Sequence, residues 1–242
     1  MTYRYKTTSN FYWVRDNKIA SEFPKINSAL KDPDGLLAIG GDLSPERLIQ
    51  AYRRGIFPWY SQGQPLLWWS PDPRWVLDPE QIKVSRSLKK TLKKNKFTVT
   101  FNHAFESVIQ ECASPRKDMS GTWITREMQI SYLKLFKQGY AHSVECWHEN
   151  KLAGGLYGVI IGKVFFGESM FARVPDASKV ALVYLSRILT KWEFPLIDCQ
   201  VHSSHLESLG AIPVPRNTFA SLLNKYCNIK NRNTWPDKKE SI

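Results

Sequence analysis

Residues 154–174 read GGLYGVIIGKVFFGESMFARV, and together with the two segments that follow they decide the fold. A turn at Gly162 interrupts the apolar run, which predicts two antiparallel strands. Residues 176–192, DASKVALVYLSRILTKW, repeat apolar side chains at helical spacing and predict one long helix. Residues 196–201, LIDCQV, predict a short buried strand after it.

This last strand carries two polar residues. Because side chains alternate along a strand, we expect Leu196, Asp198 and Gln200 to share one face and Ile197 to lie on the other. A carboxylate and an amide in an apolar strand are costly to bury unless they are hydrogen-bonded, so they form either a paired structural element or a functional site. Glu168 adds a third polar group at the end of an apolar strand, and convergence of the three would favour chemistry.

The charge balance indicates an anionic partner. The chain of 242 residues has 34 Lys and Arg against 22 Asp and Glu, a net charge of +12. A chain this basic attracts polyanions, most often nucleic acid. No apolar run approaches the roughly 20 residues of a membrane-spanning helix, so a membrane partner is not expected. The N-terminus lacks the apolar core of a secretory signal, and we expect a cytoplasmic protein.

The four cysteines lie far apart in the sequence, at Cys112, Cys146, Cys199 and Cys227. They form no CxxC pair, so they predict neither a disulfide framework nor a zinc ribbon. No metal site is expected.

Two segments upstream suggest a division into domains. Residues 35–60 hold an apolar run, a glycine turn and a predicted helix that begins near Ser44 and ends at Gly55. Residues 66–77, LLWWSPDPRWVL, contain two prolines, which argue against a helix or a central strand and favour an ordered connection between domains. We therefore expect a small N-terminal domain over residues 1–72 and a larger domain over residues 73–242.

The densest charge run is KVSRSLKKTLKKNK, residues 83–96. Ser85 is a suitable N-cap for a helix whose cations face solvent. A charged helix face is often only a solvated surface, but here no acidic residue is interleaved, and that imbalance favours contacts with phosphates. The order of elements along the whole chain predicts an α+β fold of the acetyltransferase type.

Several blocks of the sequence resemble the bacterial leucyl/phenylalanyl-tRNA–protein transferase family. They are GLLAIGGDLSPERLIQAYRRGIFPW, LWWSPDPRWVL, GTWIT, GYAHSVECW, GESMF with ASKVAL, and LIDCQV with HLESLGA. The resemblance implies transfer of Leu or Phe, and also Met, from aminoacyl-tRNA to the N-terminal Arg or Lys of a protein, which marks that protein for N-end-rule degradation. It implies a small N-terminal domain, a GNAT-like C-terminal domain and no cofactor.

The expected reaction assigns roles to the polar residues. We expect Gln200 to contact the attacking amine or the ester, and Asp198 to orient it and favour proton removal. Glu168 and Asp198 together would make the site negative and suit a cationic acceptor side chain.

The resemblance also maps three binding regions onto the sequence. The apolar pocket for the donor side chain maps onto Leu156, Phe165, Leu182, Leu185 and Ile197. Contacts with the 3′-terminal adenosine map onto Tyr52, Trp59 and Trp123, which offer rings for stacking. Phosphates of the tRNA are expected on Arg86, Lys89, Lys90 and Lys93.

Two other functions remain open from the sequence alone. A Fem-like enzyme that adds amino acids to a peptidoglycan precursor would share the fold and the donor but lack the N-terminal blocks. An RNA-binding module on a degenerate acetyltransferase scaffold is the non-enzymatic alternative. For each apolar pocket residue and each tryptophan, plain core packing is also an alternative.

Overall fold

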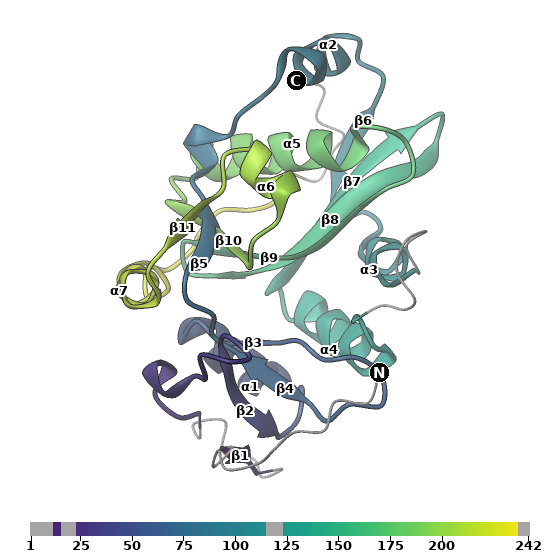
Figure 1. Cartoon of the computed structure of the whole chain (residues 1–242). Coiled ribbons are helices and arrows are strands. Elements are labelled where there is room, and N and C mark those ends of the chain that lie inside the picture. The colour runs from purple at the N-terminus through teal and green to yellow at the C-terminus, as the bar shows by residue number, and fades with distance from the viewer. Residues whose placement is uncertain (1–11, 16–22, 115–122, 237–242) are drawn as a thin grey trace.

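The computed structural model describes residues 12–15, 23–114 and 123–236. It has two sheets, a small one near the N-terminus and a large one formed by the rest of the chain (Figure 1). Within the described residues the small sheet has the order β1-β2-β4-β3. Its strands are β1 (Trp13–Val14), β2 (Leu36–Gly40), β3 (Phe57–Pro58) and β4 (Leu67–Trp69).

Helix α1 (Pro45–Arg53) packs beside this small sheet. Ser44 is its N-cap, Pro45 occupies the first turn, and Gly55 follows the end with a φ of +75°. A positive φ suits glycine, which has no Cβ to clash with the backbone. The helix predicted within residues 35–60 is therefore confirmed.

The large sheet has the order β11-β5-β10-β9-β8-β7-β6 over the described residues. Its strands are β5 (Arg74–Leu77), β6 (Thr98–Phe101), β7 (Ala141–His148), β8 (Lys151–Ile161), β9 (Val164–Ala172), β10 (Leu196–Gln200) and β11 (Ile212–Val214). The pairs are antiparallel except β9 with β10, which helix α5 (Ala177–Lys191) connects in parallel. The predicted α+β fold is confirmed.

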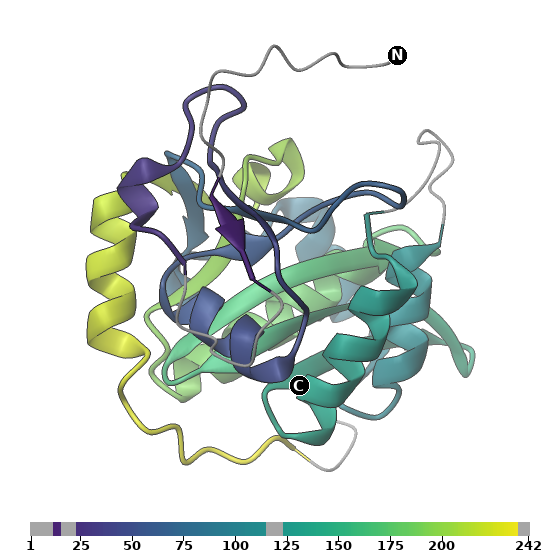
Figure 2. The ribbon, with the colours of Figure 1, turned by 90° about the horizontal axis from the view of Figure 1, so that it is seen from below.

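Helices cover both faces of the large sheet. The remaining ones are α2 (Arg86–Lys93), α3 (Phe105–Ala113), α4 (Arg126–Lys137), α6 (Ser204–Ser208) and α7 (Arg216–Tyr226). Helix α5 packs on one face with α2 beside it, and α3 and α4 pack on the other face. The small sheet and α1 lie on the same side as α4 (Figure 2). Two apolar cores result, one on each face of the large sheet.

One predicted connection is wrong. Residues 66–77 were expected to lack strands because of Pro71 and Pro73, but β4 and β5 occupy both ends of this segment. The two prolines lie between the strands, where no ladder hydrogen bond is lost. The chain thus passes from the small sheet to the large one within a few residues. The domain division at residue 72 stays a prediction.

Strand β9 contains one extra residue next to β8. Tyr157 pairs with Ser169 and Gly158 pairs with Gly167, so Glu168 has no partner in the ladder. Such a bulge bends the strand and redirects a side chain. Gly158 permits the close approach there, because an added Cβ would lie 2.3 Å from the carbonyl oxygen of Phe166.

Strand β10 contains a second bulge, next to β5. Asp198 pairs with Val76 and Gln200 with Trp75, which leaves Cys199 as the extra residue. Gln200 has a φ of +64°, in the left-handed region that side chains rarely adopt. Simple alternation along LIDCQV therefore fails at its end. Leu196 and Ile197 do face opposite cores, as predicted.

No helix among the described residues is long and apolar enough to cross a membrane.

Candidate active site

A cavity of about 1010 Å³ opens where β9 and β10 separate. Their parallel ladder runs from Leu196 opposite Val164 to Asp198 opposite Phe166. Beyond that point β9 stays paired with β8 except at Glu168. Residues 167–172 and residues 197–201 line the cavity. Helix α5, residues 57–59 and residues around the start of α6 form other parts of the wall.

The apolar end of the cavity contains the five side chains predicted for the donor pocket. All are at least 96 % buried and line the same cavity: Leu156, Phe165, Leu182, Leu185 and Ile197. They come from three strands and from α5, so separate parts of the chain meet here as expected. Ile197 belongs to the core on the α5 side, and its neighbour Asp198 points the other way toward Arg74.

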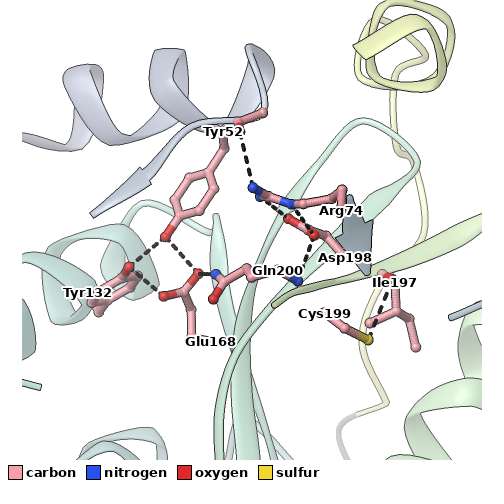
Figure 3. Close-up of polar contacts among 9 residues, drawn as sticks. Tyr52, Arg74, Tyr132, Glu168, Ile197, Asp198, Cys199 and Gln200 are labelled. Atoms are coloured by element: carbon pink, nitrogen blue, oxygen red, sulfur yellow. Dashed lines mark hydrogen bonds and ion pairs between the residues drawn. The ribbon is translucent and has the colours of Figure 1, made fainter. Parts of the chain in front are cut away.

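Asp198 forms a buried ion pair with Arg74 from β5 (Figure 3). Nε of Arg74 donates to Oδ1 at 2.8 Å, and Nη2 donates to Oδ2 at 2.6 Å. Both residues are at most 1 % exposed. The guanidinium also donates to the carbonyl of Gly55 and lies between the rings of Phe57 and Phe219. A fork of this kind neutralises the carboxylate and fixes its orientation.

The same carboxylate holds the backbone of Gln200. Its Oδ1 accepts a hydrogen bond from the Gln200 backbone N–H at 2.9 Å. This bond stabilises the unusual backbone at Gln200, because it gives the buried N–H a partner where the ladder is interrupted. Asp198 therefore holds the backbone of Gln200, and its expected part in proton removal stays a prediction.

Side chains from three segments of the fold lie within hydrogen-bonding distance of the Glu168 carboxyl group (Figure 3). The Gln200 amide Nε2 donates to its Oε1 at 3.0 Å, and the Tyr52 hydroxyl donates to the same oxygen at 2.7 Å. The Tyr132 hydroxyl lies 2.7 Å from Oε2, and the two tyrosine oxygens are 2.5 Å apart. Glu168 and Gln200, expected to act in one site, are thus in direct contact.

Burial raises the pKa of Glu168 to about 7. Hydrogen bonds from Tyr132 and Tyr52 act in the opposite direction, and Asp198 raises the pKa further while Arg74 lowers it. Desolvation is the largest of these effects because an ionised carboxylate loses its water on burial. Glu168 and Asp198 therefore do not form the doubly negative site that the sequence suggested: one is matched by a cation and the other titrates near neutrality.

The three aromatic residues predicted to bind adenosine are placed differently. Trp59 is 41 % exposed and lines the cavity, and the half-buried Trp123 lines it as well. Tyr52 is completely buried, with its ring against Phe166. Its ring face has no room for a base, so the expected stacking by Tyr52 is wrong, and its hydroxyl contacts Glu168 instead.

The basic helix α2 lies on the opposite side of α5 from the small sheet (Figure 1). Ser85 caps it by accepting a bond from the backbone N–H of Leu88, as predicted. Thr91 donates to Asp176 at the start of α5, two residues before the cavity-lining Ser178. The four cations predicted to bind phosphate are exposed: Arg86, Lys89, Lys90 and Lys93.

Sequence reasoning missed Arg74 and Tyr132. Arg74 is the one basic residue in the apolar segment LLWWSPDPRWVL, and a buried carboxylate such as Asp198 requires a buried cation. That requirement was a usable signal. Tyr132 gave none, because a tyrosine within an amphipathic helix is indistinguishable from a core residue.

An open cavity with an apolar end beside an amide and a carboxyl group fits an enzyme that holds an acyl group and transfers it. The fold and the site together thus define an acyltransferase. A family model described as leucyl/phenylalanyl-tRNA protein transferase matches residues 76–224, and one for the N-terminal domain of that transferase matches residues 41–72. The chain belongs to this family of aminoacyltransferases.

Individual relatives agree with the family match. The chain is 55 % identical over 225 residues to the leucyl/phenylalanyl-tRNA–protein transferase of Nitrosomonas europaea, covering 90 % of this chain and 95 % of that protein. It is 57 % identical over 202 residues to the enzyme of the same name from Cellvibrio japonicus, covering 84 % and 86 %. Among solved structures, a GCN5-related N-acetyltransferase from Kribbella flavida matches with a TM-score of 0.36 and 10 % identity, over 70 % of this chain and 60 % of that one.

Proposed function

We propose that this protein transfers Leu or Phe, and also Met, from aminoacyl-tRNA to the N-terminal Arg or Lys of another protein and so marks that protein for degradation. The cavity is the observation that supports this most directly. Its apolar end has the size and lining for a hydrophobic amino-acid side chain. Its polar end contains Gln200 and Glu168, at the position that the ester group of the bound aminoacyl-tRNA would occupy.

The reaction is the aminolysis of an activated ester. The α-amine of the acceptor attacks the ester carbonyl, a C–N bond forms, the C–O bond to the terminal ribose breaks, and the amine proton passes to the ribose oxygen. An α-amine has a pKa of about 8, so a good fraction is already neutral at pH 7. Positioning of the two reactants therefore supplies much of the rate, and Gln200 is placed to do this.

Donor selection follows from the lining of the apolar compartment. A smooth apolar wall distinguishes one methylene by only about 1–3 kcal/mol, so Leu, Phe and Met are all accepted. The side chains of Leu182 and Leu185 from α5 and of Leu156 from β8 limit the width of the compartment. Branching at Cβ, as in Ile and Val, is excluded by shape.

The tRNA is held at two places. Trp59 and Trp123 at the cavity offer aromatic surface to the terminal adenosine. The exposed cations of α2 contact phosphates of the acceptor stem, which requires density of charge more than exact spacing. Because α2 contacts the start of α5, the phosphate contacts and the donor pocket share one rigid element.

The test is direct transfer. The protein is incubated with Leu-tRNA carrying radiolabelled leucine and with peptides that begin in Arg, Lys or Ala and are otherwise identical. We expect label only in the peptides that begin in Arg or Lys. Equal labelling of the Ala peptide, or release of free leucine without peptide product, would contradict the proposal.

A further inference from the structure

The contacts around Glu168 place four oxygen atoms in a chain. Oε1 of Glu168 is 2.7 Å from the Tyr52 hydroxyl, which is 2.5 Å from the Tyr132 hydroxyl, which is 2.7 Å from Oε2 of Glu168. The carboxyl group closes the chain into a ring. Each of these distances is that of an O–H···O hydrogen bond, and each such bond requires one proton.

A count of protons decides the state of the carboxyl group. The two phenols supply two protons for three contacts. If Glu168 were ionised, both phenol protons would point to its oxygens, and two lone-pair-bearing phenol oxygens would face each other at 2.5 Å. Gln200 does not supply the missing proton to this contact, because its Nε2 donates to Oε1. The third proton must belong to Glu168.

We propose that Glu168 is a neutral carboxylic acid in the resting enzyme, and that as such it is a positioning residue that holds the amide of Gln200 in its catalytic orientation. Oε2 donates to Tyr132, Tyr132 donates to Tyr52, and Tyr52 donates to Oε1. Oε1 is then a carbonyl oxygen with two lone pairs, one for Tyr52 and one for the Gln200 amide. Every proton in the ring then has an acceptor.

The surroundings favour the neutral state. Glu168 is 7 % exposed, and its desolvation opposes ionisation. The nearest charges are Asp198 and Arg74, which largely cancel because they pair with each other. Burial also raises the pKa of Tyr52, Tyr132 and Tyr157, so these phenols remain neutral.

This assignment rests on the proposed function and adds to it. With Nε2 of Gln200 held by Glu168, the amide oxygen of Gln200 is left to accept a hydrogen bond from the attacking amine. When Glu168 loses its proton, the contact between the two phenols loses its hydrogen and the ring must rearrange. Transfer is therefore expected to fall as pH rises past the point where Glu168 ionises, even though the acceptor amine becomes more reactive.

The decisive variant is Glu168→Gln, because an amide reproduces the ring. Its NH₂ donates to Tyr132 and its oxygen accepts from Tyr52 and Gln200. We expect this variant to keep transfer within about threefold of the wild type at pH 7, since no hydrogen bond is lost. Its profile of kcat/KM against pH should lack the alkaline decrease. Glu168→Ala, which leaves buried hydroxyls without partners, should lose on the order of tenfold or more.

A second measurement does not depend on activity. Infrared difference spectra of the wild type minus Glu168→Gln should show the carbonyl band of a protonated carboxylic acid at pH 6, and this band should disappear as pH is raised. The matched control is Glu111→Gln, which removes a carboxyl group at the rim of the same cavity that is paired with Arg173. The Glu111→Gln protein should keep both the carboxylic acid band and the decrease of kcat/KM at alkaline pH.

The outcomes separate this inference from the proposed function. Absence of the carboxylic acid band at pH 6 overturns the inference whatever the activity. A folded Glu168→Gln protein that has lost transfer also overturns it, because the charge would then be required. A wild type that shows the band but transfers nothing to Arg peptides contradicts the proposed function and leaves the protonation state standing.

Discussion

Asp198 and Glu168 are both buried carboxyl groups at one cavity, and the protein treats them in opposite ways. Asp198 is matched by the guanidinium of Arg74 and serves as an anchor for the backbone of Gln200. Glu168 faces phenols and an amide, so burial raises its pKa to about 7. Two carboxyl groups with such different surroundings can perform separate tasks. Here one holds the main chain of Gln200 and the other holds its side chain.

Removal of only one partner of the Arg74–Asp198 ion pair should destabilise the protein. Arg74→Met leaves the Asp198 carboxylate buried without its partner, and we expect a loss of about 3–5 kcal/mol in the free energy of unfolding, measured by urea denaturation. The double variant Arg74→Met/Asp198→Leu should regain much of this stability but not the transfer activity, because the backbone N–H of Gln200 has lost its acceptor. An Arg74→Met protein with the same free energy of unfolding as the wild type would contradict this prediction.

Leu182 should influence which donor is used. Leu182→Ala widens the apolar compartment, and we expect kcat/KM for Phe-tRNA relative to Leu-tRNA to rise about tenfold or more, since lost contacts affect the smaller side chain most. The control is Leu189→Ala, on the same helix and equally buried, but away from the cavity lining. It should lower stability by about 2–5 kcal/mol with an unchanged donor ratio.

Local signals explain what the sequence predicted well. Helix α1, the cap of α2 and the turn at Gly162 depend on residues a few positions apart, and all three were predicted correctly. The convergence of Glu168 with Gln200 was also predicted. The two bulges were not, because a bulge exists only relative to a partner strand whose register is unknown from one sequence. The contacts of Glu168 with Tyr52 and Tyr132 were not predicted either, because both tyrosines come from helices that are distant in the sequence.

Among the elements, the bulges of β9 and β10 determine the geometry of the site. Each inserts one residue where the two parallel strands separate, at Glu168 and at Cys199. The insertion at Cys199 gives Gln200 its left-handed backbone, which directs its amide across the gap toward Glu168. Without bulges, regular strands would continue their ladder, and the cavity between them would close.

Helix α2 should account for a definable part of tRNA affinity. In the triple variant Lys89→Gln/Lys90→Gln/Lys93→Gln, each lost phosphate contact should reduce the slope of log K against log salt by about 0.7–0.9. Filter binding of Leu-tRNA over a range of salt concentrations measures this. A triple variant of exposed lysines elsewhere, Lys134→Gln/Lys137→Gln/Lys225→Gln, should leave the slope unchanged. Equal slopes for both variants would argue against α2 as the phosphate site.

For the whole molecule, Glu168 links stability to pH. Its pKa is about 7 in the folded protein against 4.5 ordinarily, so the folded state binds this proton more tightly. The stabilisation is complete below pH 4.5 and is lost as pH rises to about 7, a change of about 3 kcal/mol. Unfolding of the wild type and of Glu168→Gln should be compared across this range, because their difference isolates Glu168 from other titrating groups. A difference that does not vary with pH would contradict the raised pKa.

Arg74 also affects the stage of folding at which the site forms. Its guanidinium touches Gly55, Phe57, Asp198 and Phe219, which come from both sheets and from the last helix. Contacts this distant in sequence form late in folding, because the intervening loops must first be closed. A fragment that ends before Asp198 lacks the carboxylate that pairs with Arg74, so it cannot form this part of the site. Transfer activity is therefore expected only after the segments that carry Asp198 and Phe219 have folded onto Arg74.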